Sequence, residues 1–179
     1  MDLQTIKDRI PDYARDLRLN LDAVINRSSL TPAQAAGAAV AAAFAAKSPA
    51  LVAALQDDSA LEPTHRDAAL TAAALMGMNN VWYPFVEMAA DPELKTVRPE
   101  LRMNAYANHG GVDRTSFELY ALAASIVGKC EFCVQSHYRL LRENGFTTQQ
   151  LRDVGRIAAV VNAVAQVLAV KQIDATATA

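Results

Sequence analysis

Residues 31–46 read TPAQAAGAAVAAAFAA, a run of alanine that follows a threonine and a proline. Threonine is a common N-cap residue and proline is favoured in the first helical turn, so Thr31 and Pro32 mark a helix start. Alanine has the highest helix propensity of all residues. The apolar part, residues 35–46, is shorter than the roughly 20 residues that span a bilayer. The stretch therefore predicts a helix within a close-packed helical protein.

Signals for further helices extend along the rest of the chain. Apolar residues recur at helical spacing near the N-terminus, with a break expected near Asp12 because Pro11 interrupts the pattern. Further helices are predicted after Ser48-Pro49, from Thr64 to about Met76, and from Asn79 to Ala90. Three more are predicted from Asp113 or Thr115 to just before Gly128, over 130–143, and from Thr147 or Thr148 onward. A turn is expected at Asp58-Ser59 and a linker over 91–99. No segment alternates apolar and polar residues as a strand does. The predicted fold class is all-α.

Composition and charge exclude several classes of protein. The chain has 179 residues, of which 52% are hydrophobic and 20% are charged, which is the balance of a folded globular protein. Its formal net charge of −2 and the lack of a basic run argue against a nucleic-acid partner. Charges spread through the N-terminal segment, which therefore lacks the apolar core of a secretory signal. We expect one cytoplasmic domain over residues 1–179, without membrane association.

A weak internal repeat is visible when the chain is compared with itself. A shift of 51 residues aligns Thr64 with Thr115, Gly77 with Gly128, Asn79 with Cys130 and Trp82 with Cys133. The coincidence predicts two helix–turn–helix copies, a degenerate one over about 64–90 and a catalytic one over about 115–141. In the degenerate copy, we expect Asn79 and Trp82 to make packing or interface contacts instead of lining a thiol site.

The two cysteines of the chain, Cys130 and Cys133, lie in the segment 128–137, which reads GKCEFCVQSH. A helix is expected to end at the glycine, which puts both cysteines in the first turn of the next helix. Unpaired N–H groups and the positive end of the helix dipole there, together with Lys129, favour a thiolate. Such settings lower the pKa of a cysteine from about 8.5 to roughly 3.5–7.5. We therefore expect a nucleophilic thiol near neutral pH.

The spacing of these residues suits reversible redox chemistry. Positions three apart on a helix have Cβ atoms about 5–6 Å apart, whereas a disulfide prefers about 3.5–4.5 Å. A modest local adjustment would therefore let Cys130 and Cys133 form a bridge that is easily reduced again. His137 follows Cys133 by four residues and shares its helix face. Its imidazole can take the thiol proton directly or through one water.

Each of these residues also has a simpler interpretation. The cysteines could be buried structural residues. A zinc site would need four ligands, and His65 and His109 are distant in the sequence. A c-type haem signature needs a histidine directly after the second cysteine, where this chain has Val134. Considered alone, His137 would be a surface residue and Glu118 a solvated helix charge. We expect no bound metal or cofactor.

Several motifs of the chain occur together in one known family. They are Pro11-Asp12-Tyr13-Ala14, Met76-Gly77-Met78-Asn79-Asn80-Val81, Leu101-Arg102-Met103-Asn104, Phe117-Glu118-Leu119, the Cys130–Cys133 pair and His137. Nearly end to end, the chain resembles the AhpD family of bacterial alkyl hydroperoxide reductases, in the wider carboxymuconolactone-decarboxylase-like superfamily. The resemblance implies an all-helical homotrimer with thiol-dependent peroxidase activity. It also implies an adaptor that passes electrons from dihydrolipoamide, carried by the acyltransferase of a dehydrogenase complex, to the peroxiredoxin AhpC.

The resemblance further implies a role for each residue of the predicted site. Cys133 would be the thiol that is oxidised to the sulfenic acid, and Cys130 its disulfide partner and proton donor. His137 and Glu118 would form a proton relay to the thiol. Members of the family often carry a histidine just before the second cysteine, whereas this chain has Phe132. The departure puts a role for position 132 in doubt and leaves the other four residues in place.

Two other functions remain as alternatives. A carboxymuconolactone decarboxylase-like enzyme would share the fold but would not need the CxxC pair. A non-catalytic helical oligomerisation module would carry the two cysteines incidentally. Reversible loss of two hydrogens after peroxide treatment would be expected only of the redox enzyme.

Overall fold

The computed structural model describes residues 2–58 and 61–177, and these residues form helices and loops without any β-strand. The α-helices are α1 (Leu3–Asp8), α2 (Asp16–Asn26), α3 (Pro32–Ala45), α4 (Pro49–Asp58), α5 (Pro63–Ala89), α6 (Asn104–Ala107), α7 (Arg114–Gly128), α8 (Glu131–Glu143) and α9 (Thr148–Ala177). Three short 3-10 helices are η1 (Asp12–Ala14), η2 (Leu94–Thr96) and η3 (His109–Gly111). The predicted all-α fold class is confirmed.

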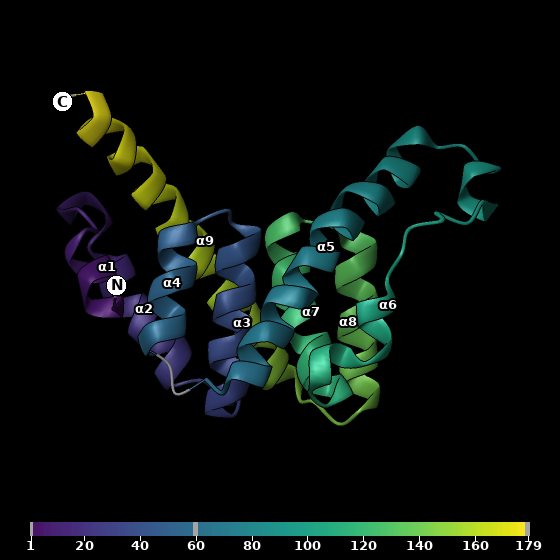
Figure 1. The fold of residues 1–179 in the computed structure, drawn as a ribbon, viewed down its shortest axis with the longest axis horizontal. Helices are drawn as coiled ribbons and strands as arrows, with labels where there is room; N and C mark the ends of the chain where they lie inside the picture. Colours follow the sequence, from purple (N-terminus) through teal and green to yellow (C-terminus); the bar gives the residue numbers. More distant parts are fainter. Residues whose placement is uncertain (1, 59–60, 178–179) are drawn as a thin grey trace.

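Helix α3, the alanine-rich segment, lies at the centre of the molecule. It contacts α5, α7 and α9 and stands between the N-terminal helices and the α5–α7–α8 group (Figure 1). Its residues from Ala35 to Ala43 are all buried. Short side chains let the neighbouring helices approach closely, and at Gly37 the ring of Tyr120 from α7 occupies the space that a Cβ would need. The alanine tract thus forms the core of the bundle.

Helix α9 is the longest element and packs along α2, α3 and α7. Its apolar side chains are buried at Leu151, Val154, Ile157, Ala158, Val161, Val164, Ala165 and Leu168. By length and composition alone, residues 148–171 could also cross a membrane. Core helices of soluble proteins meet the same criterion, and the buried face of α9 is accounted for by its contacts with the bundle.

Several predicted helix boundaries are confirmed. Thr31 caps α3 through a capping box with Gln34, and Pro32 occupies the first turn. Asp113 caps α7, because its side chain accepts a hydrogen bond from the Ser116 N–H at 2.9 Å. The chain breaks between α1 and α2, around Pro11, as predicted. The turn predicted at Asp58-Ser59 involves a residue outside the described ranges.

The turn predicted after Gly77 is wrong. Helix α5 continues without interruption from Pro63 to Ala89, starts at Pro63 instead of being capped by Thr64, and accommodates Pro84 in its interior. A helix ends where the backbone turns left-handed, as at Lys129 after α7, where φ is 56°. Gly77 has no such conformation. Residues 64–90 therefore do not form the predicted helix–turn–helix, and the repeat does not hold in that form.

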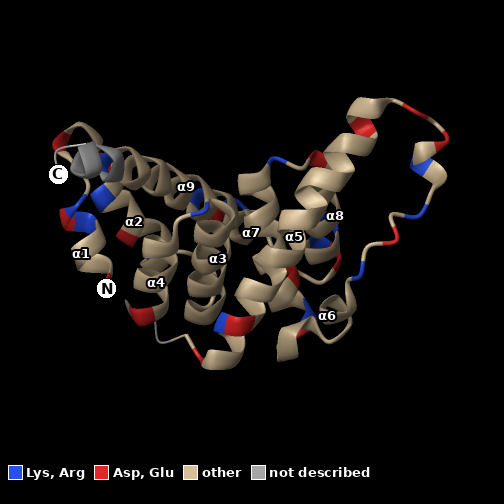
Figure 2. Ribbon diagram, turned by 45° about the horizontal axis from the view of Figure 1, so that its top comes forward, with Lys and Arg blue, Asp and Glu red and all other residues tan. Residues whose placement is uncertain are grey.

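The C-terminal half of α5 and the loop that follows it project from the bundle (Figure 1). Acidic and basic residues are both present along this loop (Figure 2), and Lys95 pairs with Glu87 of α5 at 3.0 Å. The loop returns the chain to α6, which contacts α5. The segment brings Met103 and Tyr106 close to the start of α8, where they line one cavity together with Cys133.

Candidate active site

The two cysteines lie where α7 turns into α8. Lys129 has a left-handed backbone that ends α7, and Cys130 then takes an extended conformation as the N-cap of α8. Cys133 is in the first turn of α8, and its N–H donates a hydrogen bond to Cys130 Sγ at 3.2 Å. The predicted helix-start position is confirmed, with Cys130 at the cap instead of inside the helix. The hydrogen bond from the Cys133 N–H and the positive end of the α8 dipole favour a thiolate on Cys130.

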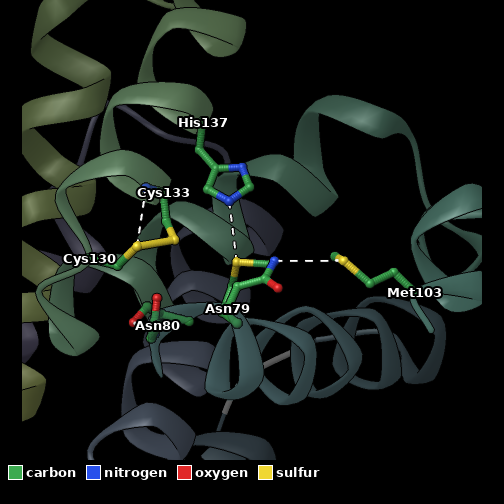
Figure 3. The surroundings of a disulfide bond; sticks show 8 residues. Asn79, Asn80, Met103, Cys130, Cys133 and His137 are labelled. Carbon is green, nitrogen blue, oxygen red and sulfur yellow. Dashed lines mark hydrogen bonds between the residues drawn. A yellow bond between two sulfur atoms is a disulfide. The ribbon is translucent and has the colours of Figure 1, made fainter. Parts of the chain in front are cut away.

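Cys130 and Cys133 form a disulfide in the structure (Figure 3). Their Cα atoms are 5.3 Å apart, and both residues are buried. Because Cys130 lies at the cap with extended backbone, the bridge forms without unwinding α8. This is the local adjustment that the three-residue spacing required.

A cavity of about 150 Å³ opens beside the disulfide. Its lining residues come from α5, α8 and the α6 region: Met76, Asn79, Tyr83, Met103, Tyr106, Phe132, Cys133, Ser136 and His137. Cys133 faces this cavity, whereas Cys130 is fully buried and is not among the residues that line it. A small substrate that enters the cavity therefore meets the sulfur of Cys133 first.

His137 and Glu118 form a buried pair at the cavity wall. His137 Nδ1 lies 2.6 Å from Glu118 Oε2. An ionised carboxylate can only accept a hydrogen bond, so the ring carries its proton on Nδ1. In the neutral form of this tautomer, Nε2 is the ring nitrogen that can accept a proton, and it lies 3.3 Å from the sulfur of Met76. The pair thus holds an imidazole in one orientation in the cavity that Cys133 also lines.

The second carboxylate oxygen of Glu118 accepts a hydrogen bond from the hydroxyl of Tyr106. Glu118 is fully buried, and burial raises its pKa, but the hydrogen bonds from His137 and Tyr106 and the charge of Arg114 outweigh burial and hold the pKa below its ordinary value. Burial and the contact with Glu118 raise the pKa of Tyr106. Glu118 is therefore a carboxylate, and Tyr106 a neutral donor, at neutral pH.

The structure brings all four predicted residues together. Cys130, Cys133 and His137 lie on the first turns of α8, and Glu118 reaches His137 from α7. No sequence pattern pointed to Tyr106, which lies in a segment without helical periodicity and reaches Glu118 only through the fold.

The expectation for Asn79 is wrong. Asn79 lines the thiol cavity and directs its side-chain amide toward the sulfur of Met103 at 3.8 Å, instead of packing elsewhere (Figure 3). The reason is the uninterrupted α5, which carries Met76, Asn79 and Tyr83 along one face at spacings of three and four residues. Trp82, on a neighbouring face, is half-buried and contacts Phe85 with ring centroids 5.8 Å apart.

No group of three or more His, Cys, Asp or Glu side chains is placed to hold a metal ion in the described part of the chain. The reactive groups at and beside the cavity are two cysteines that form a disulfide, one imidazole and one carboxylate.

The chain is similar to known proteins over nearly its whole length. It is 44% identical over 170 residues to an alkyl hydroperoxide reductase AhpD of Rhodospirillum centenum, which covers 94% of this chain and 91% of that protein. It is 42% identical to the protein of that name from a Bradyrhizobium species, covering 92% of each chain. For the protein of that name from Coxiella burnetii the identity is 40%, covering 92% of this chain and 96% of the relative. The chain belongs to the AhpD family.

Residues 92–175 also match the Carboxymuconolactone decarboxylase family. That segment runs from the loop after α5 into α9 and contains Glu118, Cys130, Cys133 and His137. The family resemblance predicted from the sequence is confirmed. All four predicted site residues thus lie in the part of the chain that matches the wider family.

Proposed function

We propose that this protein is a thiol-dependent antioxidant oxidoreductase that reduces alkyl hydroperoxides through Cys133 and Cys130. The observation that carries the proposal is the cavity that both Cys133 and the imidazole of His137 line, with Glu118 hydrogen-bonded to the ring at Nδ1. The name of its relatives, alkyl hydroperoxide reductase, supports the same class of substrate.

In the oxidative half of the cycle, His137 Nε2 takes the proton of the Cys133 thiol, and the thiolate attacks the terminal oxygen of the hydroperoxide. The O–O bond breaks as the S–O bond forms, and the alkoxide takes the proton back from His137 and leaves as the alcohol. The product on the enzyme is the sulfenic acid of Cys133. The Cys130 sulfur then attacks Cys133 Sγ, water leaves, and the disulfide forms.

In the reductive half, a dithiol restores the two thiols, and dihydrolipoamide is the proposed reductant. Its first thiolate attacks the accessible sulfur, Cys133 Sγ, and Cys130 leaves. A low pKa makes a better leaving thiol, and the N-cap position of Cys130 supplies that property. The second thiol of the lipoamide then closes its own ring and releases Cys133, so that two electrons and two protons pass to the enzyme.

The partners and location belong to the same proposal. Electrons would come from the lipoyl-bearing acyltransferase of a dehydrogenase complex and pass on to the peroxiredoxin AhpC, in the cytoplasm. The protein would act as a homotrimer. Exposed apolar side chains on the projecting part of α5, which include Val81, Phe85 and Met88, support the expectation of association.

A carboxymuconolactone decarboxylase-like activity is the second candidate, because residues 92–175 match the family of that name. Such an activity would not use a disulfide. The disulfide between Cys133, which lines the cavity, and the fully buried Cys130 therefore favours the redox enzyme, and it equally disfavours a purely structural oligomerisation module.

A coupled assay tests the proposal. The protein is combined with lipoamide, lipoamide dehydrogenase, NADH and cumene hydroperoxide, with and without the peroxiredoxin, and NADH consumption is followed. We expect consumption that requires both the lipoamide and the hydroperoxide and that is lost in Cys133→Ser. A rate that rises with the peroxiredoxin supports the relay. If no hydroperoxide-dependent consumption occurs under either condition, the proposed function is wrong.

A further inference from the structure

We infer that Tyr106 is a positioning residue for the thiol chemistry: its hydroxyl holds the Glu118 carboxylate in the place from which that carboxylate orients His137. The inference rests on the proposed function, because it assigns a task within the same thiol-oxidation step. It adds a fifth residue to the four that the sequence predicted, from a segment that the sequence did not connect with the site.

The geometry places Glu118 between two donors. Oε2 accepts from His137 Nδ1 at 2.6 Å, and Oε1 accepts from the hydroxyl of Tyr106. The nearest cation, Arg114, lies with its Nε 4.0 Å from Oε1, beyond hydrogen-bond distance, and its side chain is mostly exposed. Within the described residues, Tyr106 is thus the only hydrogen-bond partner of Oε1.

Burial makes this hydrogen bond necessary. A carboxylate that is removed from water is costly unless its oxygens are hydrogen-bonded or paired with charge. Without the Tyr106 hydroxyl, Oε1 would be a buried, unsatisfied acceptor. Glu118 would then either take up a proton or turn away, and both changes would release the Nδ1–H of His137 from its fixed orientation.

Neighbouring rings hold the ring of Tyr106 in place and so fix the position of its hydroxyl. It makes edge contacts with Phe117, at 5.6 Å between ring centroids, and with His109, at 6.2 Å. Tyr106 also lines the cavity. His137 of α8 and Tyr106 of α6 therefore both line the cavity, and both are hydrogen-bonded to the buried Glu118.

The test compares two variants that each remove one tyrosine hydroxyl. Tyr106→Phe keeps the ring contacts and removes the donor to Glu118, whereas Tyr138→Phe is the matched control because Tyr138 is exposed on α8 and does not line the cavity. A hydrogen bond to a charged group contributes about 1.5–3 kcal/mol, which corresponds to about 10- to 150-fold in rate. We expect kcat/KM for cumene hydroperoxide to fall by about that factor in Tyr106→Phe and to stay near wild type in Tyr138→Phe.

Two further readouts separate positioning from a structural effect. The pKa of Glu118, followed by carboxyl NMR titration and assigned with Glu118→Gln, should rise by about one to two units in Tyr106→Phe. In the Glu118→Gln background, the same substitution should cost little more activity, because its target is already gone. An unshifted pKa, or an equal loss of activity with and without Glu118, would overturn the inference. Wild-type protein without peroxidase activity would instead overturn the proposed function.

Discussion

The two cysteines are chemically different although they are three residues apart. Cys133 faces the cavity, whereas Cys130 is fully buried at the N-cap of α8 and accepts a hydrogen bond from the Cys133 N–H. One sulfur is therefore accessible to a peroxide, and the other is a stabilised partner that attacks second. The order of reaction follows from the position of each cysteine at the helix start.

This asymmetry gives the first prediction. Cys133→Ser and Cys130→Ser should each abolish turnover, because neither can form the intramolecular disulfide. Only Cys130→Ser should accumulate a sulfenic acid after peroxide treatment, and it should over-oxidise with time. Dimedone labelling followed by mass spectrometry of the peptides checks this. Label found at position 130 of Cys133→Ser, and not at position 133 of Cys130→Ser, would reverse the two roles.

The second prediction concerns the His137–Glu118 pair. His137→Gln and Glu118→Gln should each slow the thiol-oxidation step by about 10²–10⁴-fold, the usual contribution of a positioned acid or base. Because the two act as one unit, the double variant should be only slightly slower than the worse single variant. Single-turnover oxidation rates of the reduced protein measure this. Losses that multiply fully would show that the residues act independently.

At this scale the sequence predicted the local part of the site and missed the rest. Three of the predicted features are short-range patterns: the spacing of the two cysteines, the helix start beside them, and a histidine four residues after Cys133. All three appear in the structure. Glu118 was predicted only through the family resemblance, because 19 residues separate it from His137. Tyr106 and Asn79 reach the cavity from other elements, and no local pattern could reveal that.

Among the elements, α5 shows how a plausible helix end can mislead. Gly77 falls at the register of Gly128, and a glycine near the end of a periodic segment often marks a C-cap. At Gly128 the end is real, because Lys129 turns left-handed and Cys130 caps the next helix. At Gly77 no cap follows, and the helix continues to Ala89. By contrast, the helix starts at Thr31 and Asp113 have side-chain caps in the structure; Thr31 was predicted as a cap, and Asp113 was one of two candidates with Thr115.

The third prediction uses these two glycines as a matched pair. A Cβ at Gly77 would meet no atom within 4 Å, whereas at Gly128 it would run into the side chain of Asn80. Gly77→Ala should therefore raise the free energy of unfolding by about 0.5–1 kcal/mol, since alanine is the better helix former. Gly128→Ala should lower it by about 1–3 kcal/mol through overpacking. Urea denaturation measures both. A destabilising Gly77→Ala would contradict a continuous α5.

At the scale of the whole molecule, one buried carboxylate joins the N-terminal and C-terminal parts of the chain through hydrogen bonds. Asp153 of α9 accepts hydrogen bonds from the backbone N–H of Ser29 at 2.9 Å and from its hydroxyl at 2.8 Å, across 124 residues of sequence. Arg152 and Arg156 also donate to it. The sequence alone could not predict these hydrogen bonds, because Asp153 has the pattern of an ordinary surface charge in the first turns of a helix. The hydrogen bonds hold the loop before α3, the core helix, against α9.

The environment of Asp153 makes it a pH-dependent stabiliser. Burial raises its pKa, but the hydrogen bonds from Ser29 and the two arginines outweigh burial and hold the pKa well below its ordinary value. A group whose pKa is lower in the folded than in the unfolded state stabilises the fold above the unfolded pKa, here about 3.9. That stabilisation is lost as the pH falls from there through the folded pKa.

The last prediction follows from the lowered pKa of Asp153. Asp153→Asn should lower the free energy of unfolding at neutral pH by about 2 kcal/mol, the order of magnitude for buried hydrogen bonds to a charged group. The difference from wild type should persist at mildly acidic pH and narrow below about pH 4, where the unfolded wild-type carboxyl takes up its proton. Arg152→Ala is the control: its side chain is 60% exposed, so its loss should cost less than about 1 kcal/mol. Urea denaturation across the pH range measures both variants, and a difference that did not narrow in acid would mean that Asp153 stabilises the fold through packing instead of through its charge.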